Sequence, residues 1–185
     1  MTALDVVIMA AGKGTRMKSS MPKVLHRLAG KALVQHVIDT ARSLKARHTI
    51  VITGHGADQV EPALLSANPN DKLQFARQMP QLGTGHAVQQ TVPLLADDAV
   101  VVVLSGDVPL TQADTLTALM ACAQGPSGKT DRLALLTLEM PNPTGYGRIV
   151  RTISGDKVQA IVEQKDASEA QRQIKEVYSG IMAVP

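Results

Sequence analysis

Short apolar runs alternate with longer segments of helical pattern through the first two thirds of the chain. The runs at 5–9, 48–53, 73–77 and 99–104 have the length and the Val and Ile content of buried strands. The intervening patterns predict helices at 33–44, 57–66, 85–96 and 111–123. Strands that alternate with helices in this way predict an α/β fold with a doubly wound, mostly parallel, Rossmann-like sheet and right-handed crossovers.

The pattern changes in the last third of the chain. Strands are predicted at 132–139, 148–153 and 157–163, and the turn at Ser154-Gly155-Asp156 joins the last two into an antiparallel hairpin. A polar helix is predicted at 167–176, capped by Asp166 or Ser168, and a final strand at 177–184. We expect one domain, because 185 residues can bury a single sizeable core.

Three glycine-bearing loops, at 9–17, 83–86 and 105–107, each follow a predicted strand. Ligands of open parallel sheets collect outside the carboxyl ends of the strands, so these loops should meet at one edge. The first loop holds Gly12 and Gly14, with Lys13, Arg16 and Lys23 close behind. Glycine lets backbone N–H groups approach a ligand, and cations neutralise phosphoryl oxygens. Together the loops predict a nucleotide site.

Two better-known phosphate motifs do not match the first loop. No Gly-Lys-Ser/Thr ending follows Gly12 at the spacing of a Walker A loop. The dinucleotide fingerprint requires Gly or Ala where this chain has Met17, and the nearest downstream acid, Asp39, falls inside a helical pattern. A P-loop is therefore excluded, and an NAD site is disfavoured.

Composition narrows the choice of partner and compartment. The chain has no Trp, one Phe and two Tyr, and its net charge is +3, which disfavours a nucleic-acid surface. The lone Cys122 permits no internal disulfide, and its apolar neighbours predict a core position. No basic leader or apolar run near 18 residues is present, so we expect a cytoplasmic protein without a membrane span.

Several motifs together resemble one family. They are Ala10-Ala-Gly-Lys-Gly-Thr-Arg-Met17, Pro22-Lys-Val-Leu-His26, Gln81-Leu-Gly-Thr-Gly-His-Ala87, Gly106-Asp-Val-Pro-Leu110, Pro143-Thr-Gly-Tyr-Gly-Arg-Ile149 and Ile161-Val-Glu-Gln-Lys-Asp-Ala167. The first is similar to the signature loop of the sugar-nucleotide pyrophosphorylases. The full set resembles the uridyltransferase domain of the bacterial bifunctional uridyltransferase/acetyltransferases, over essentially the whole chain.

This resemblance implies transfer of UMP from UTP to N-acetylglucosamine 1-phosphate, with Mg²⁺ as cofactor and small molecules as the only substrates. It implies nucleotide contacts at Met9, Ala10, Ala11 and Gly12, uracil contacts at Gln78, Gly83 and Thr84, and substrate contacts at Ser105 and Gly106. It implies phosphate contacts at Lys13, Arg16 and Lys23, with Arg16 and Lys23 catalytic, a metal ligand at Asp107, and sugar contacts at Gly147 and Glu163.

The chemistry of the reaction agrees with these assignments. The attacking phosphate oxygen is already ionised at neutral pH, so no general base is needed and the difficulty is repulsion between two anions. Arg16, Lys13, Lys23 and Mg²⁺ would neutralise and align the α-phosphate for in-line displacement, a contribution of several kcal/mol. One carboxylate, Asp107, is sufficient when phosphates and waters complete the Mg²⁺ shell.

Alternative interpretations of the same residues stay open. Asp107 could cap the following helix, Gln78 could be a solvated loop residue, and Glu163 could pair with Lys165 or Arg148. The protein could also be a pyrophosphorylase for another base or sugar. A non-catalytic nucleotide-binding module or an NAD-binding domain are alternatives of a different class.

The chain departs from the resembled family at two points. Tyr178 stands where the family has an Asn that contacts the sugar or ribose. The chain also ends at Pro185, so we expect it to be the N-terminal part of the transferase domain. The family's remaining transferase segment, and the β-helix domain through which full-length relatives trimerise, would then lie outside it. We accordingly expect weak or no turnover from this polypeptide alone.

Overall fold

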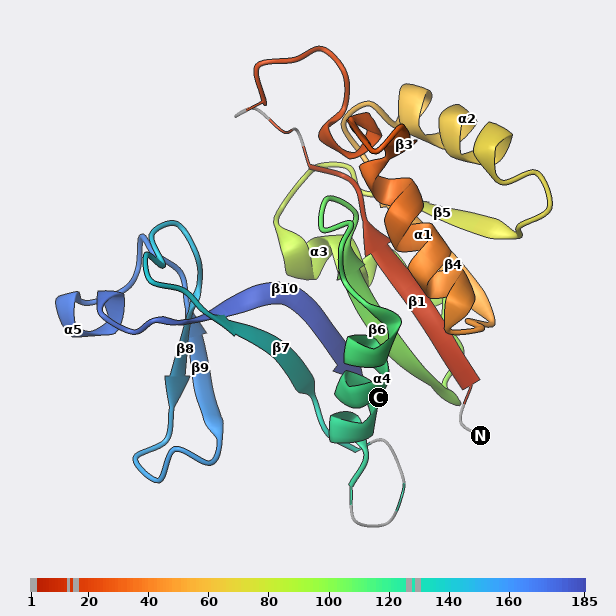
Figure 1. Cartoon of the computed structure of the whole chain (residues 1–185). Coiled ribbons are helices and arrows are strands. Elements are labelled where there is room, and N and C mark those ends of the chain that lie inside the picture. The colour runs from red at the N-terminus through yellow and green to blue at the C-terminus, as the bar shows by residue number, and fades with distance from the viewer. Residues whose placement is uncertain (1–2, 13, 15–16, 126–127, 129–130) are drawn as a thin grey trace. The chain divides into compact units, whose positions relative to one another are not determined.

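The computed structural model describes residues 3–12, 14, 17–125, 128 and 131–185. These residues form two compact units (Figure 1). The first unit comprises Met1–Ala134 with Met182–Pro185, and the second comprises Leu135–Ile181.

The first unit is built on a parallel sheet. Its strands, in spatial order, are β5 (Leu73–Arg77), β4 (His48–Thr53), β1 (Ala3–Met9) and β6 (Ala99–Ser105), all parallel. The end of β10, at 182–184, runs antiparallel to β6. The predicted mostly parallel α/β sheet is confirmed, and the predicted bounds of β4 and β5 agree with the structure.

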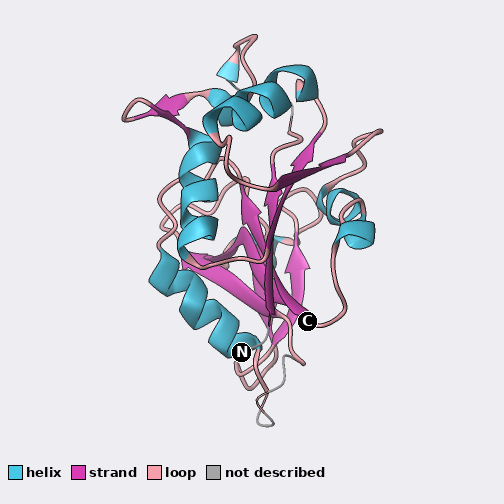
Figure 2. Cartoon of the chain, turned by 90° about the vertical axis from the view of Figure 1, so that its right-hand side faces the viewer, coloured by secondary structure: helices cyan, strands magenta, loops and turns pink. Residues whose placement is uncertain are grey.

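Both faces of this sheet are buried, because side chains alternate across a strand and each face is covered. One face forms a cluster in which Val7, Ile50 and Val103 pack with Ala87 of α3 (Thr84–Gln89). The alternate residues of β1, such as Val6 and Ile8, are also fully buried. Figure 2 shows α1 (Leu33–Ser43) and α4 (Ala113–Ala123) together on one side of the strands.

The segment predicted as one helix at 85–96 is divided in the structure, so that prediction was wrong in length. Helix α3 ends at Gln89, and a separate 3-10 turn, η3, spans Val92–Leu94. Pro93 explains the break, because proline lacks an N–H donor and its ring clashes with the preceding helical turn. The helix predicted at 57–66 agrees closely with α2 (Ala57–Ala67).

The long connection after β1 contains local structure that the sequence pattern did not reveal. A 3-10 turn, η2, spans Lys23–Leu25. A two-stranded hairpin follows, made of β2 (Arg27–Leu28) and β3 (Lys31–Ala32). These elements are too short to produce a periodic pattern, which explains why they were missed.

The second unit is antiparallel. Strands β8 (Arg148–Arg151) and β9 (Val158–Val162) form the predicted hairpin, and β8 and β7 (Ala134–Glu139) each pair with β10 (Glu176–Val184). The helix predicted at 167–176 is reduced to α5 (Glu169–Arg172). Ser168 caps this helix in a capping box: its hydroxyl accepts from the Gln171 N–H, and the Gln171 side chain accepts from the Ser168 N–H. Strand β10 then begins at Glu176.

Cys122 corrects another expectation. It lies on an exposed face of α4 rather than in the core. The buried face of the helix carries Leu116, Leu119 and Ala123. Apolar neighbours in sequence therefore misled the prediction, because only one side of the helix is buried and Cys122 lies outside it.

Candidate active site

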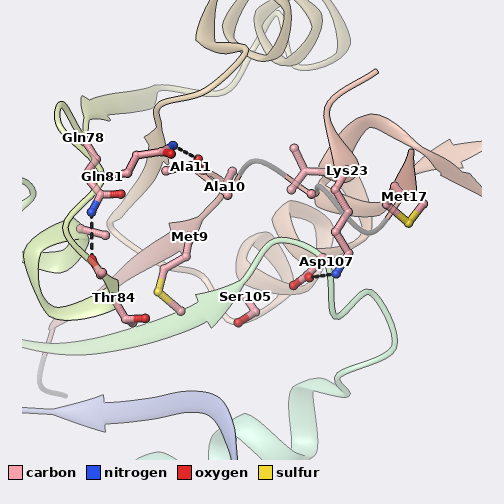
Figure 3. A pocket seen from close by; sticks show the side chains of 15 residues that line it. Met9, Ala10, Ala11, Met17, Lys23, Gln78, Gln81, Thr84, Ser105 and Asp107 are labelled. Atoms are coloured by element: carbon pink, nitrogen blue, oxygen red, sulfur yellow. Dashed lines mark hydrogen bonds and ion pairs between the residues drawn. The ribbon is translucent and has the colours of Figure 1, made fainter. Parts of the chain in front are cut away.

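A cavity of about 530 Å³ opens at the carboxyl ends of β1, β5 and β6 in the first unit (Figure 3). Most of its lining comes from residues that the sequence singled out: Met9, Ala10, Ala11, Gly12, Lys23, Gln78, Gly83, Thr84, Ser105 and Asp107. The parallel sheet thus brings the three glycine-bearing loops together at one edge, as expected from their position after strands. Lys13 and Arg16 lie outside the described residues.

Strand register fixes how the first and third loops meet. Met9 lies opposite Ser105 on β6 and opposite Ile52 on β4. Backbone hydrogen bonds continue the sheet by one step, from the Gly106 N–H to the Met9 carbonyl at 2.9 Å and from the Ala10 N–H to the Ile52 carbonyl at 2.9 Å. The Asp107 carboxylate consequently emerges beside the first loop.

Two glycines leave space for the segment that contains Pro22 and Lys23. A Cβ on Gly14, which has a φ of +59°, would lie 2.8 Å from Lys23 Cβ. A Cβ on Gly56, with a φ of +74°, would lie 2.7 Å from Pro22 Cγ. Side chains rarely adopt these positive φ values, and Cβ atoms do not approach so closely. Both glycines are therefore needed for Pro22 and Lys23 to take their places beside the cavity.

Lys23 and Asp107 form an ion pair at one end of the cavity. Lys23 Nζ lies 2.5 Å from Asp107 Oδ2, and the two side chains are 36% and 31% exposed. Asp107 does not cap the next helix, because α4 begins after Gln112 and has no side-chain cap. The helix-cap interpretation of Asp107 is therefore wrong in this structure.

The Asp107 carboxylate also bears on metal binding. Within the described part of the chain, no three His, Cys, Asp or Glu side chains gather closely enough to hold an ion by themselves. Mg²⁺ nevertheless requires only one or two carboxylates when phosphate oxygens and waters supply its other ligands. A hard carboxylate oxygen at the rim of a cavity lined by glycine loops fits that coordination.

Gln78 lies at the other end of the cavity and is 4% exposed. This burial excludes the solvated-loop interpretation. Its amide nitrogen donates to the Gly83 carbonyl at 2.8 Å and lies 3.3 Å from Nδ1 of His86. In Figure 3 the nitrogen points toward Gly83, while the amide oxygen points away from it, toward the side of Ala10. The Gln78 amide oxygen is thus a hydrogen-bond acceptor for a ligand in the cavity.

Gln81 lines the cavity although it was not among the predicted site residues. Its amide nitrogen donates to the Ala11 carbonyl and so connects the second glycine-bearing loop to the first. Gly54 makes room for this contact, because a Cβ there would lie 2.9 Å from the Gln81 nitrogen. Gln81 is the first residue of the glycine-bearing motif at 81–87, but only the fold shows which carbonyl it reaches.

The second unit brings Gly147 and Glu163 together through hairpin pairing. A Cβ on Gly147 would lie 3.5 Å from Glu163 Oε1. Glu163 makes no ion pair with Lys165 or Arg148 among the described residues, and Arg148 instead donates to the Tyr146 carbonyl and to Gln164. The ion-pair alternative for Glu163 is thus not realised.

Tyr178 is the residue that departs from the resembled family. Its backbone N–H donates to the Gly147 carbonyl at 2.9 Å. Its buried hydroxyl has no hydrogen-bond partner among the residues that the structure describes. Burial raises the pKa of this phenol to about 12, so the hydroxyl remains protonated at neutral pH and retains its donor.

Comparison with known sequences identifies the family. Residues 6–176 match the MobA-like NTP transferase domain. The chain belongs to this family. Divalent-metal dependence is typical of such nucleotidyltransferases, in agreement with the carboxylate at the rim of the cavity. Among the described residues, none of the helices has both the length and the apolar content that a membrane span needs.

Two relatives of this transferase domain are similar over nearly the whole chain. The bifunctional protein GlmU of Albidiferax ferrireducens is 66% identical over 98% of the chain, and GlmU of Acidovorax ebreus is 64% identical over 100% of it. The chain spans 38% of the length of each of these relatives.

Solved structures of low sequence identity share the fold. HddC from Yersinia pseudotuberculosis, in a complex with GMP-PN, matches with a TM-score of 0.72 at 23% identity, covering 100% of this chain and 76% of that one. A UDP-glucose pyrophosphorylase in complex with UDP-glucose matches with a TM-score of 0.74 at 18% identity, covering 98% and 76%. These likenesses support the nucleotidyltransferase type of fold.

Proposed function

We propose that this chain forms the nucleotide-binding part of an enzyme that transfers UMP from UTP to N-acetylglucosamine 1-phosphate. The products are UDP-N-acetylglucosamine, a cell-wall precursor, and pyrophosphate. The observation that carries the proposal is the cavity of about 530 Å³, with the Gln78 amide at one end and the Lys23–Asp107 pair at the other. An amide suits a base edge, and a cation beside a metal-binding carboxylate suits a triphosphate.

The reaction proposed is an in-line displacement at the α-phosphorus of UTP. An ionised oxygen of the sugar phosphate forms the new P–O bond, while the bond to the bridging oxygen of pyrophosphate breaks and pyrophosphate leaves with that electron pair. No proton has to be transferred, so the reaction needs no general base. The residues of the chain contribute by positioning the phosphates and by neutralising their charge.

In this scheme Lys23 exchanges its partner Asp107 for the phosphates of the nucleotide. In the structure its ammonium is held by Asp107, and both side chains are partly open to the cavity. Phosphoryl oxygens would give Lys23 a new partner and free the carboxylate for metal. Mg²⁺, held by Asp107, phosphates and waters, would supply neutralisation of charge on the phosphoryl oxygens. Lys13 and Arg16 are assigned to the phosphates by family resemblance.

The acceptor sugar is assigned to the second unit. Gly147 and Glu163 lie together there, and the absence of a side chain on Gly147 keeps the space beside the Glu163 carboxylate open. A carboxylate accepts hydrogen bonds from sugar hydroxyl or amide groups.

The proposal extends to the cellular setting. The GlmU relatives are longer, and this chain corresponds to 38% of their length. We therefore assign to it the N-terminal part of a uridyltransferase domain in a cytoplasmic enzyme with small-molecule substrates. Complete turnover is assigned to the whole protein, in which further transferase residues and a trimerising domain would be present.

The decisive experiment is equilibrium binding by titration calorimetry in the presence of Mg²⁺. UTP and UDP-N-acetylglucosamine would be compared with dTTP, ATP and NADH. We expect the uridine ligands to bind at least roughly tenfold more tightly than ATP, because the hydrogen-bonding groups of the cavity would match the edge of uracil and not that of a purine. Preference for another nucleotide would assign the chain a different base specificity, and preference for NADH would overturn the proposal.

A further inference from the structure

The orientation of the Gln78 carboxamide is set first by a neighbour that can only accept a hydrogen bond. The Gly83 carbonyl oxygen is such an atom, and it lies 2.8 Å from one end of the amide. That end must therefore be the NH₂ group, because two oxygens would repel each other at this distance. Because Gln78 is buried, water cannot supply the hydrogen bonds that the opposite orientation of the amide would lose.

His86 makes the second contact with the same NH₂ group. Its Nδ1 lies 3.3 Å from the Gln78 nitrogen, on the first helical turns of α3. For this contact to be favourable, Nδ1 must carry the lone pair and Nε2 the proton. In that tautomer both amide protons of Gln78 have acceptors, one on Gly83 and one on His86.

Gln90 also lies beside the His86 ring and would favour the other tautomer. Its amide nitrogen donates to the backbone carbonyl of His86 at 3.0 Å and lies 3.3 Å from Nε2 of the ring. A neutral imidazole has only one acceptor nitrogen, so it cannot accept from both glutamines. Gln78 is the more constrained of the two, because it is buried and already fixed by Gly83. Gln90 is only half-buried and keeps its hydrogen bond to the His86 carbonyl, so it does not depend on the ring for a partner.

We propose that His86 is a positioning residue for base selection: it holds the Gln78 carboxamide so that its oxygen faces the cavity and accepts from a pyrimidine N3–H. The inference rests on the proposed function. Uracil has a proton on N3, whereas cytosine has a lone pair there. With Oε1 fixed toward the cavity, cytosine would place that lone pair against the Gln78 oxygen and lose affinity.

Without the acceptor on His86, the amide of Gln78 is held only by Gly83. Rotation of the amide would then present its NH₂ group to the cavity at a smaller cost, and this group can donate to N3 of cytosine. The expected signature is a change in the ratio of UTP to CTP affinities. A residue that merely supported the fold would lower both affinities together.

The test measures the dissociation constants of UTP and CTP, with Mg²⁺, for the full chain and for substitutions at His86. For the unmodified chain we expect UTP to bind at least roughly tenfold more tightly than CTP, as for other sites that reject a mismatched hydrogen-bonding group. His86→Phe keeps the ring but removes the acceptor, and should reduce this preference several-fold. His86→Asn restores an oxygen near the place of Nδ1 and should recover it, whereas His86→Gln places its amide near Nε2 and should not.

His55→Phe provides the matched control, since His55 is exposed and does not line the cavity. It should leave the preference unchanged. Equal preference for UTP in His86→Phe and in the unmodified chain would overturn the inference and leave the proposed function standing. A parallel loss of both affinities, with the ratio kept, would also overturn it. No preference for UTP over CTP in the unmodified chain would overturn the proposed function and this inference with it.

A second measurement needs no substitution. The ¹⁵N chemical shifts of the His86 ring report which nitrogen carries the proton. We expect a pyridine-like shift for Nδ1 and a pyrrole-like shift for Nε2 at neutral pH. A ring protonated on Nδ1 would contradict the contact with Gln78 and overturn the inference, whether or not the substituted proteins fold.

Discussion

The two ends of the parallel sheet in the first unit each hold a carboxylate, but under different conditions. At the amino end of β1, Asp5 is fully buried and receives two hydrogen bonds from the Arg47 guanidinium, at 3.1 and 3.0 Å. Arg47 also donates to Asp98 at 3.0 Å. At the carboxyl end, Asp107 meets the single ammonium of Lys23, and both side chains remain about a third exposed.

The difference shows how one sheet separates stability from ligand binding. A planar guanidinium binds both oxygens of Asp5 at once, and His48 Nδ1 lies 3.2 Å from one of them, so the buried carboxylate is surrounded by protein groups. An ammonium is a point charge on a flexible stem, and it occupies one oxygen of Asp107 while the cavity remains open beside it. The amino-end pair is closed, and the carboxyl-end pair can be exchanged for a ligand.

Asp107→Ala should have the largest effect of the changes that separate the two ends. We expect it to lower Mg²⁺-dependent UMP transfer by roughly 10³-fold in the complete protein, because the charge that holds the metal is lost. Pyrophosphate release measures this rate. Asp98→Ala, at the amino end and 73% exposed, is the matched control and should retain activity. Unchanged activity in Asp107→Ala would contradict the role given to the carboxylate.

Asp5→Asn tests the amino end. The change keeps the shape but removes the charge that pairs with Arg47, so we expect a loss of about 2 kcal/mol in the free energy of unfolding. Urea denaturation followed by circular dichroism measures this quantity. Affinity for UTP should be unchanged below the unfolding transition, since Asp5 lies at the end of β1 opposite the cavity. A stable Asp5→Asn protein would show that the closed pair contributes little.

The pH dependence of stability also tests the contribution of the Asp5–Arg47 pair. Burial alone would raise the pKa of Asp5, but hydrogen bonding and charge from Arg47 outweigh it and hold the pKa below its ordinary value of 3.8. A carboxylate with a lowered folded pKa stabilises the protein above its unfolded pKa, and this stabilisation is lost as the pH falls through the folded value. The stability difference between the unmodified chain and Asp5→Asn should therefore shrink as the pH falls below about 4. A difference that grows at acid pH would contradict this.

Gly54→Ala should have the smallest of these effects, and it acts at the carboxyl end. The added Cβ would lie 2.9 Å from the Gln81 nitrogen and 3.0 Å from Ala11 Cβ. It should push Gln81 from the Ala11 carbonyl and weaken UTP binding by roughly tenfold, the equivalent of one lost hydrogen bond. Calorimetric titration would detect this shift. An affinity equal to that of the unmodified chain would show that Gln81 does not hold the two loops in a productive arrangement.

The strands, the alternation that makes the sheet parallel, and the edge at which the glycine loops meet could all be predicted from the sequence. These features follow from local patterns: Val and Ile runs are buried on both faces, and glycines punctuate the ends of strands. For the same reason the motifs at 10–17, 81–87 and 106–110 already pointed to a nucleotide site. The hairpin of the second unit was equally visible, because its two strands are joined by a short turn.

Which side chains meet could be seen only in the folded chain. Lys23 and Asp107 are 84 residues apart, and Gln81 and Ala11 are 70 apart, so no local pattern could pair them. Their contacts depend on strand register and on the close approach of backbones at Gly14 and Gly54. Cys122 shows the same limit from the other side, since its exposure depends on which face of α4 packs inward. Sequence patterns report the period of an element, whereas contacts between elements are fixed only when their surfaces pack together.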